Sequence, residues 1–159
     1  MKARPRSVER KVAIYLSNMF DKLTPVERIP VNGRRGPDIS INELGLVIDV
    51  KSRIEIPKSW TSIPNIGTDG KLIGITLSQL SILHSIDLTN IPKVSSSIIV
   101  NNYYKHMDEW TKINMPNGVT TIILHKPNSR ISSAIMVVEL INLFSLQKKL
   151  KEDYERLIF

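Results

Sequence analysis

Two aspartates and a lysine occupy a predicted β-hairpin at a spacing that brings their side chains to one face. Residues 38–41 and 46–51 alternate in side-chain type and are separated by Asn-Glu-Leu-Gly, a pattern typical of a hairpin. If those four residues form the loop, Asp38 lies directly opposite Asp49, with the two Cβ atoms about 4.5–5.5 Å apart. Lys51 points to the same face as Asp49, because side chains alternate along a strand.

These residue types in this arrangement suggest metal-dependent hydrolysis. Paired carboxylates repel each other, and a divalent cation between them would offset the repulsion, because hard cations prefer oxygen ligands. A lysine beside such an ion can hold an attacking water or stabilise charge on a phosphate. Glu9, at the edge of the apolar stripe of a predicted helix, offers a third carboxylate. Each residue also has an ordinary explanation, as a first-turn acid, a turn residue or a solvated ion pair, but their coincidence favours a metal site.

The same residues resemble a known signature. The chain contains Gly-Pro-Asp ending at Asp38 and, after ten further residues, Asp-Val-Lys beginning at Asp49. This pattern resembles the motif of the PD-(D/E)XK nuclease superfamily. With Glu9 in a preceding helix, the chain most resembles the archaeal-type Holliday junction resolvases and their phage-encoded relatives. Asp49 stands where that family more often has glutamate.

The resemblance implies an enzyme of DNA recombination and repair. It would be a homodimer that hydrolyses DNA phosphodiesters and makes paired nicks in a four-way junction. Glu9, Asp38 and Asp49 would hold one or two Mg²⁺ ions, for which Mn²⁺ can substitute. Lys51 would orient the attacking water and complete the catalytic set.

Other polar residues are weaker candidates for chemistry. Ser40 shares the predicted face of Asp49, and Gln79 follows the metal-binding strand as a glutamine does in some relatives, so both are auxiliary candidates. His84, His106 and His125 are too widely spaced to predict a zinc site. The Gly-Lys pair at residues 70–71 lacks the upstream glycine of a P-loop, so we expect no nucleotide cofactor.

The charge of the chain favours a polyanionic partner. The net charge is +7 with a sequence pI near 9.7, and the basic surplus is concentrated in residues 1–60. A basic surface of this kind favours nucleic acid, here branched or duplex DNA. The basic turn 32–35 corresponds to the flexible DNA-contacting loop of the family that the chain resembles. The expected DNA contacts are Arg4, Arg6, Arg10, Lys11, Asn32, Arg34, Arg35 and Arg53.

One α/β domain spanning residues 1–159 is expected to position these side chains. Apolar spacing and β-rich runs predict helices over 7–23, 77–86, 98–113 and 140–157, and strands over 26–31, 38–41, 46–51, 119–124 and 133–138. The predicted order is αβββ, insertion, αββα. It matches the restriction-endonuclease-like αβββαβ core that the resemblance implies, with a mixed central sheet flanked by helices. That core comprises about residues 5–55 and 98–145, with a looped insertion at about 56–97 that the resemblance does not cover.

Composition excludes several classes of protein. The chain has no cysteine, which excludes disulfides and thiolate metal sites and indicates a reducing compartment. Its longest apolar stretch, 131–146, is too short and too polar to span a bilayer, and no secretory signal is visible. We therefore expect a cytoplasmic protein without a membrane partner, in the host cytoplasm if it is phage-encoded.

Two other functions fit the same residues. One is a nuclease of this fold that cuts linear duplex DNA in restriction or recombination, and the other is a basic DNA-binding module without catalysis. A homodimer also needs an interface, and two apolar sets are candidates, although either can be core. They are Ile98, Ile99, Tyr103, Met107 and Trp110, or Ile141 and Phe144.

Overall fold

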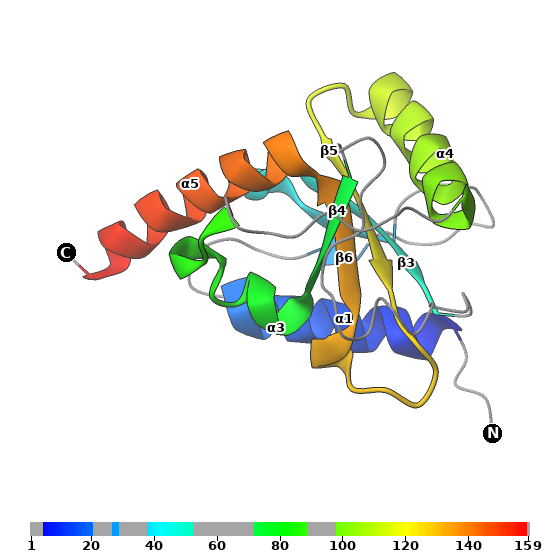
Figure 1. Ribbon diagram of the computed structural model, residues 1–159, viewed down its shortest axis with the longest axis horizontal. Coiled ribbons are helices and arrows are strands. Elements are labelled where there is room, and N and C mark those ends of the chain that lie inside the picture. Colours follow the sequence, from blue (N-terminus) through cyan, green and yellow to red (C-terminus); the bar gives the residue numbers. More distant parts are fainter. Residues whose placement is uncertain (1–4, 21–26, 29–37, 53–71, 89–97, 159) are drawn as a thin grey trace.

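A mixed β-sheet with helices on both faces organises the chain, which the computed structural model describes over residues 5–20, 27–28, 38–52, 72–88 and 98–158 (Figure 1). In chain order the elements are α1 (Pro5–Phe20), β1 (Glu27–Arg28), β2 (Ile39–Ile41), the 3₁₀ turn η1 (Asn42–Leu44), β3 (Leu46–Lys51), β4 (Leu72–Thr76), α3 (Leu77–Leu80), the 3₁₀ turn η2 (Leu83–Ser85), α4 (Ile98–Asn114), β5 (Val119–Leu124), the 3₁₀ turn η4 (Ile131–Ser133), β6 (Ile135–Glu139) and α5 (Leu140–Ile158). The six strands lie in the order β1-β2-β3-β5-β6-β4. β3 and β5 are parallel, and the other neighbouring strands are antiparallel. The predicted α/β class with a mixed sheet is confirmed.

The β2–β3 hairpin has the predicted register. Ile39 pairs with Ile48, Ser40 with Val47 and Ile41 with Leu46. The loop ends at Gly45, whose φ of 70° lies in the left-handed region that glycine tolerates without steric cost. The apolar side chains of the hairpin therefore point to one face of the sheet, and Ser40, Asp49 and Lys51 lie on the other.

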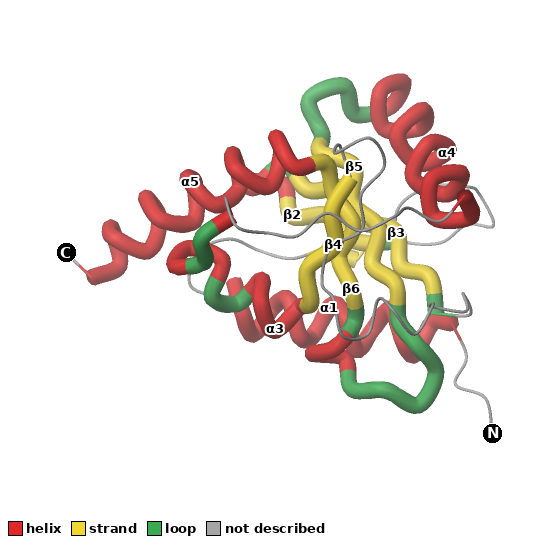
Figure 2. Tube along the Cα trace, in the orientation of Figure 1, coloured by secondary structure: helices red, strands yellow, loops and turns green. Residues whose placement is uncertain are grey.

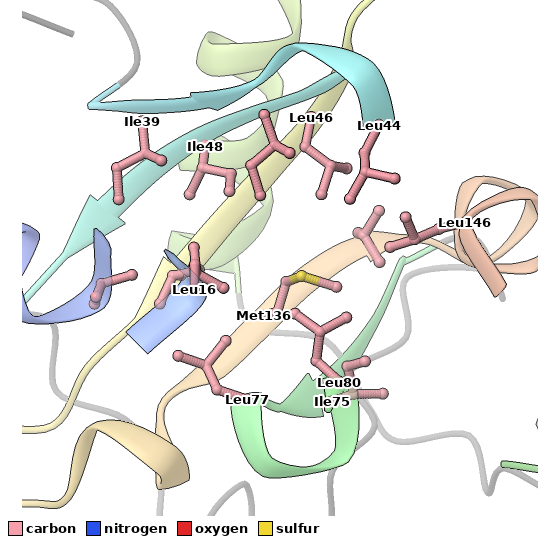
Figure 3. Packing of buried hydrophobic residues seen from close by; sticks show 14 of the residues in the cluster. Leu16, Ile39, Leu44, Leu46, Ile48, Ile75, Leu77, Leu80, Met136 and Leu146 are labelled. Carbon is pink, nitrogen blue, oxygen red and sulfur yellow. The ribbon is translucent and has the colours of Figure 1, made fainter. Parts of the chain in front are cut away.

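One face of the sheet is covered by α1, α3 and α5. Leu16, Ile48, Leu77, Met136 and Leu146 lie in the core cluster on this face (Figure 3). The stripe that α1 contributes consists of apolar residues that recur every four positions, at 8, 12, 16 and 20. This face therefore holds the larger core.

The opposite face carries α4. A second cluster joins this helix to the strands and consists of Leu72, Tyr104, Ile122, Leu124, Ile135 and Val137. In Figure 2, α4 and α1 lie on different sides of the strands. Because Asp49 and Lys51 share their face with the β5 residues Ile122 and Leu124, to which they are paired, the two charged side chains lie on the α4 side.

The segment predicted as a looped insertion contributes an edge strand that the sequence did not predict. β4 pairs with β6 from Leu72 opposite Glu139 to Thr76 opposite Ile135, and so extends the main sheet. The helix predicted over 77–86 is divided into α3 and η2. The strands predicted over 46–51 and 119–124 are present with the predicted bounds. The other predicted helices and strands are present with shifted ends, and only Glu27–Arg28 of the strand predicted over 26–31 is described. None of the helices in the described part of the chain is long and apolar enough to cross a membrane.

Candidate functional site

Asp38 and Asp49 meet at the beginning of the hairpin. The backbone N–H of Asp38 donates to the carbonyl oxygen of Ile48 at 2.8 Å, although Ile39 is already paired with Ile48. Two residues of one strand thus lie opposite one residue of the other, as in a β-bulge, and Asp38 is not the simple ladder partner of Asp49 that the register predicted. Oδ2 of Asp38 accepts a hydrogen bond from the Val50 N–H at 2.8 Å.

The side chains nevertheless meet as predicted, because the Asp38 carboxyl lies within hydrogen-bonding reach of that of Asp49 and raises its pKa. Asp49 is buried in β3, between β2 and β5. Its pKa rises from 3.8 to about 7, primarily because burial disfavours the charged form, while the neighbouring lysine acts in the opposite direction. Near neutral pH the Asp49 carboxyl is therefore partly protonated, whereas an isolated aspartate would be fully ionised.

Lys51 completes a compact group with the two carboxyls. Its Nζ lies 3.1 Å from Oδ2 of Asp49 and 5.3 Å from the ring centroid of Tyr103 on α4. The ammonium is thus held between a carboxylate and an aromatic face, and the lysine side chain is more than a third exposed. We name Asp38, Asp49 and Lys51 the carboxylate cluster.

Glu9 belongs to the helix on the other face of the sheet. It is half-buried in α1 directly after the core residue Val8, and α1 contacts β3. In Figure 1 the first turns of α1 lie near the end of β3. Among the residues that the structure describes, no three His, Asp or Glu side chains form a group that could hold one metal ion. The structure therefore brings together Asp38, Asp49 and Lys51, and it does not gather Glu9 with them into such a group.

The two auxiliary candidates differ in position. Ser40 is buried on the face of Asp49, two residues from Asp38. Gln79 is used in capping α3: its Oε1 accepts from the Thr76 N–H at 2.8 Å, and its own N–H donates to Thr76 Oγ1 at 3.1 Å. Its helix follows β4, which lies three strand spacings from β3, or about 14 Å across the sheet. The prediction that Gln79 reaches the cluster is not supported by this position.

The expected DNA contacts lie mostly outside the described residues. Arg10 and Lys11 are exposed on α1, and Arg6 lies in its first turn. The remaining candidates lie outside the described residues: Arg4, Asn32, Arg34, Arg35 and Arg53.

The contact between Tyr103 and Lys51 was not predicted from the sequence. The sequence places it only in an apolar interface set, whereas its ring lies beside the ammonium of Lys51. Periodicity shows which residues share a face of α4, but not where that helix crosses the sheet. The sequence therefore carries no signal for this contact.

The function of the protein is inferred from the geometry and chemistry of the carboxylate cluster. No family model, curated protein or solved structure matches the chain at a significant level. The donor set of Asp38 and Asp49 fits a hard divalent cation, since carboxylate oxygens are its preferred ligands. An ammonium next to that position can bind an anion such as a phosphate, so the cluster can hold a cation and an anion side by side.

Proposed function

We propose that the protein is a metal-dependent endonuclease that hydrolyses DNA phosphodiesters, with a four-way junction as its preferred substrate. The observation that carries the proposal is the buried Asp49, with the half-buried Asp38 carboxyl and Lys51 beside it. Burying the Asp49 carboxyl next to a second carboxyl costs stability, and a carboxyl group perturbed in this way is typical of functional sites. The net charge of +7 supports a polyanionic substrate.

Each residue of the cluster has a distinct task in this proposal. Asp38 and Asp49 hold Mg²⁺ or Mn²⁺, with Glu9 as a further ligand that reaches around the end of β3. The bound cation would supply Lewis-acid stabilisation of the phosphate and activation of water. Lys51 orients the attacking water and offsets charge that develops on the phosphate oxygens. The bond between the water oxygen and phosphorus forms as one P–O ester bond breaks, which leaves a nick.

The choice of a junction depends on the resemblance to the PD-(D/E)XK resolvases and on symmetry. A four-way junction has two equivalent strands to cut, and a twofold dimer presents two copies of the cluster. Of the two apolar sets proposed for the interface, Ile141 and Phe144 are the more accessible, because Met107 of the α4 set is buried. Ile141 and Phe144 lie one turn apart on α5, at 70% and 41% exposure, and we propose this face for dimer contact.

The experiment compares cleavage of a four-way junction with cleavage of a linear duplex that has the same arm sequences, in Mg²⁺ and in chelator. We expect metal-dependent paired nicks in the junction, and loss of cleavage in Glu9→Gln, Asp49→Asn and Lys51→Ala. The matched control is Asp108→Asn, which removes an acid from an ion pair with Lys112 on α4. Equal cleavage of the linear duplex would favour a restriction or recombination nuclease.

A DNA-binding module without catalysis is the second candidate. It is favoured by one observation, namely that Glu9 is not gathered with Asp38 and Asp49 into one metal-binding group in the described part of the chain. Tight binding of the junction without cleavage in Mg²⁺ or Mn²⁺ would support this candidate and contradict the nuclease.

A further inference from the structure

The connection between β5 and β6 carries two exposed cations and begins next to the backbone of Lys51. Because β5 is parallel to β3, both strands end at the same edge of the sheet. The backbone N–H of His125 donates to the carbonyl oxygen of Lys51 at 2.9 Å, so the connection begins directly next to the cluster. Lys126 and Arg130 are exposed on it. We name residues 125–130 the β5–β6 turn.

Hydrogen bonds fix the backbone of this turn at both Lys126 and Arg130. The carbonyl oxygen of Lys126 accepts from the N–H and the Oγ of Ser129, at 3.2 and 2.5 Å. The carbonyl oxygen of Arg130 accepts in the same way from Ser133, at 3.1 and 2.7 Å. The buried ring of His125 closes the turn, since its Nε2 donates to the carbonyl oxygen of Ser129 at 3.0 Å.

These bonds hold the two cationic residues in place without using their side-chain charges. Neither Lys126 nor Arg130 forms an ion pair within the described part of the chain, where the ion pairs are Lys51–Asp49 and Lys112–Asp108. Because the backbone of the turn is already fixed, it loses little further conformational entropy when the side chains bind an anion.

The sequence on both sides of the turn also contains no acidic residue. Residues 110–138 contain no acidic residue. The 3₁₀ turn η4, which follows Arg130 directly, contacts α1, the helix on which Arg10 and Lys11 are exposed. Figure 1 shows the connection at the end of the sheet where β3 ends and α1 begins. The turn therefore lies at the end of the sheet where β3 ends, and the element that follows it contacts α1.

We propose that the β5–β6 turn binds phosphate groups of the DNA backbone next to the phosphate that faces Lys51. This inference rests on the proposed function for the identity of the polyanion, and it adds a contact that the basic residues of the first third of the chain do not supply. Lys126 and Arg130 contact phosphate oxygens and not base edges, so they position the strand without reading its sequence.

The test measures binding of a four-way junction by Asp49→Asn protein over a range of salt concentrations, so that cleavage does not interfere. Lys126→Ala with Arg130→Ala should lower the slope of log K against log salt by about 2 units, because each phosphate that a cation neutralises contributes roughly 0.9 to that slope. The control is Lys148→Ala with Lys151→Ala, which removes two exposed charges from α5, the helix that extends to the opposite side in Figure 1. Lys126→Arg with Arg130→Lys should keep the parental slope.

The outcomes separate this inference from the proposed function. An unchanged slope in the alanine pair, or an equal drop in the α5 control, would overturn the role of the turn even if the parent cleaves DNA. A change in base preference at constant slope would overturn it as well. If the parent neither binds nor cleaves any DNA, the proposed function itself fails. Equal melting temperatures of the two double variants verify that the fold is intact.

Discussion

Two lysine–aspartate pairs of similar geometry lie in very different surroundings. Lys51 Nζ is 3.1 Å from the Asp49 carboxyl in the sheet, and Lys112 Nζ is 2.9 Å from the Asp108 carboxyl on α4. The side chains of Lys51 and Asp49 are 37% and 8% exposed, whereas those of Lys112 and Asp108 are 74% and 23% exposed. The buried pair also has the Asp38 carboxyl against it, which adds to the effect of burial on the pKa of Asp49.

This difference shows that a short distance between opposite charges does not by itself identify a functional site. The pair on α4 joins residues four apart in a helix, and such exposed pairs contribute little to stability because solvent screens them. The pair in β3 brings a carboxylate out of water and next to a second one, which is unfavourable unless a ligand or a reaction uses it. The following predictions test whether this contrast is functional.

The largest effect is expected on cleavage. Asp49→Asn removes a charge that the cation needs and should lower the rate of junction cleavage by about 10²–10³-fold or more. Asp108→Asn should cleave at the parental rate, since its carboxylate contacts Lys112 and Thr120 on α4 and β5. Single-turnover kinetics at saturating protein measure both rates. Robust cleavage by Asp49→Asn would remove the carboxylate cluster from the mechanism.

The pH dependence of stability should differ between the parent and Asp49→Asn. The pKa of Asp49 is raised in the folded protein from 3.8 to about 7, so the folded state binds more protons than the unfolded state between these values. The free energy of unfolding of the parent should therefore fall as pH rises from 4 to 8, by a few kcal/mol at about 1.4 kcal/mol per unit of pKa.

Asp49→Asn lacks this titration and should become the more stable protein at pH 8, with similar stability near pH 4. Urea unfolding in metal-free buffer at both pH values measures the difference. Parallel profiles for the two proteins would show that burial of the Asp49 carboxyl does not destabilise the fold.

Added Mg²⁺ should stabilise the parent selectively. A cation that binds only the folded state adds about 2.7 kcal/mol at a hundredfold excess over its Kd. It should do so in the parent and in Asp108→Asn, but much less in Asp49→Asn. Thermal melting with and without Mg²⁺ at pH 8 tests this, and equal shifts in all three proteins would place the bound cation elsewhere.

The smallest effect is expected from the aromatic contact of Lys51. Replacing Tyr103 by leucine removes the ring next to the ammonium and should slow cleavage by roughly two- to fivefold, since an exposed cation–π contact contributes about 0.5–1 kcal/mol. Tyr103→Phe keeps the ring and should retain the parental rate. If phenylalanine and leucine lower the rate equally, the hydroxyl and not the ring face matters, and Tyr103 is not a positioning residue for Lys51.

The hairpin could be predicted from sequence because its signals are local. Alternation of side chains and a four-residue loop ending in Gly45 fix which residues oppose one another, and a slip by one residue would expose the apolar face. The bulge at Asp38 could not be predicted in the same way. It depends on the Asp38 N–H bonding to a carbonyl that the ladder already assigns to the neighbouring residue.

The edge strand β4 was missed because its partner is distant in sequence. Leu72–Thr76 is short, contains Gly74 and is flanked by turn-like residues, so its local pattern is weak. Its strand identity comes from pairing with β6, whose residues lie far along the chain. The position of Tyr103 over Lys51 has the same origin, since it requires α4 and β3 to meet in space.

The parallel pairing of β3 with β5 has a consequence for synthesis of the chain. β3 is complete at Lys51, but the strand that covers its second edge begins only at Val119. During translation the hairpin therefore presents an open, apolar edge for the time needed to make the intervening residues, and such edges promote association between chains. Asp49 and Lys51 are charged residues of that strand, and charges in an exposed strand reduce such association. Replacing both by neutral residues should thus increase aggregation of nascent chains, a selective pressure on these positions that is independent of any reaction.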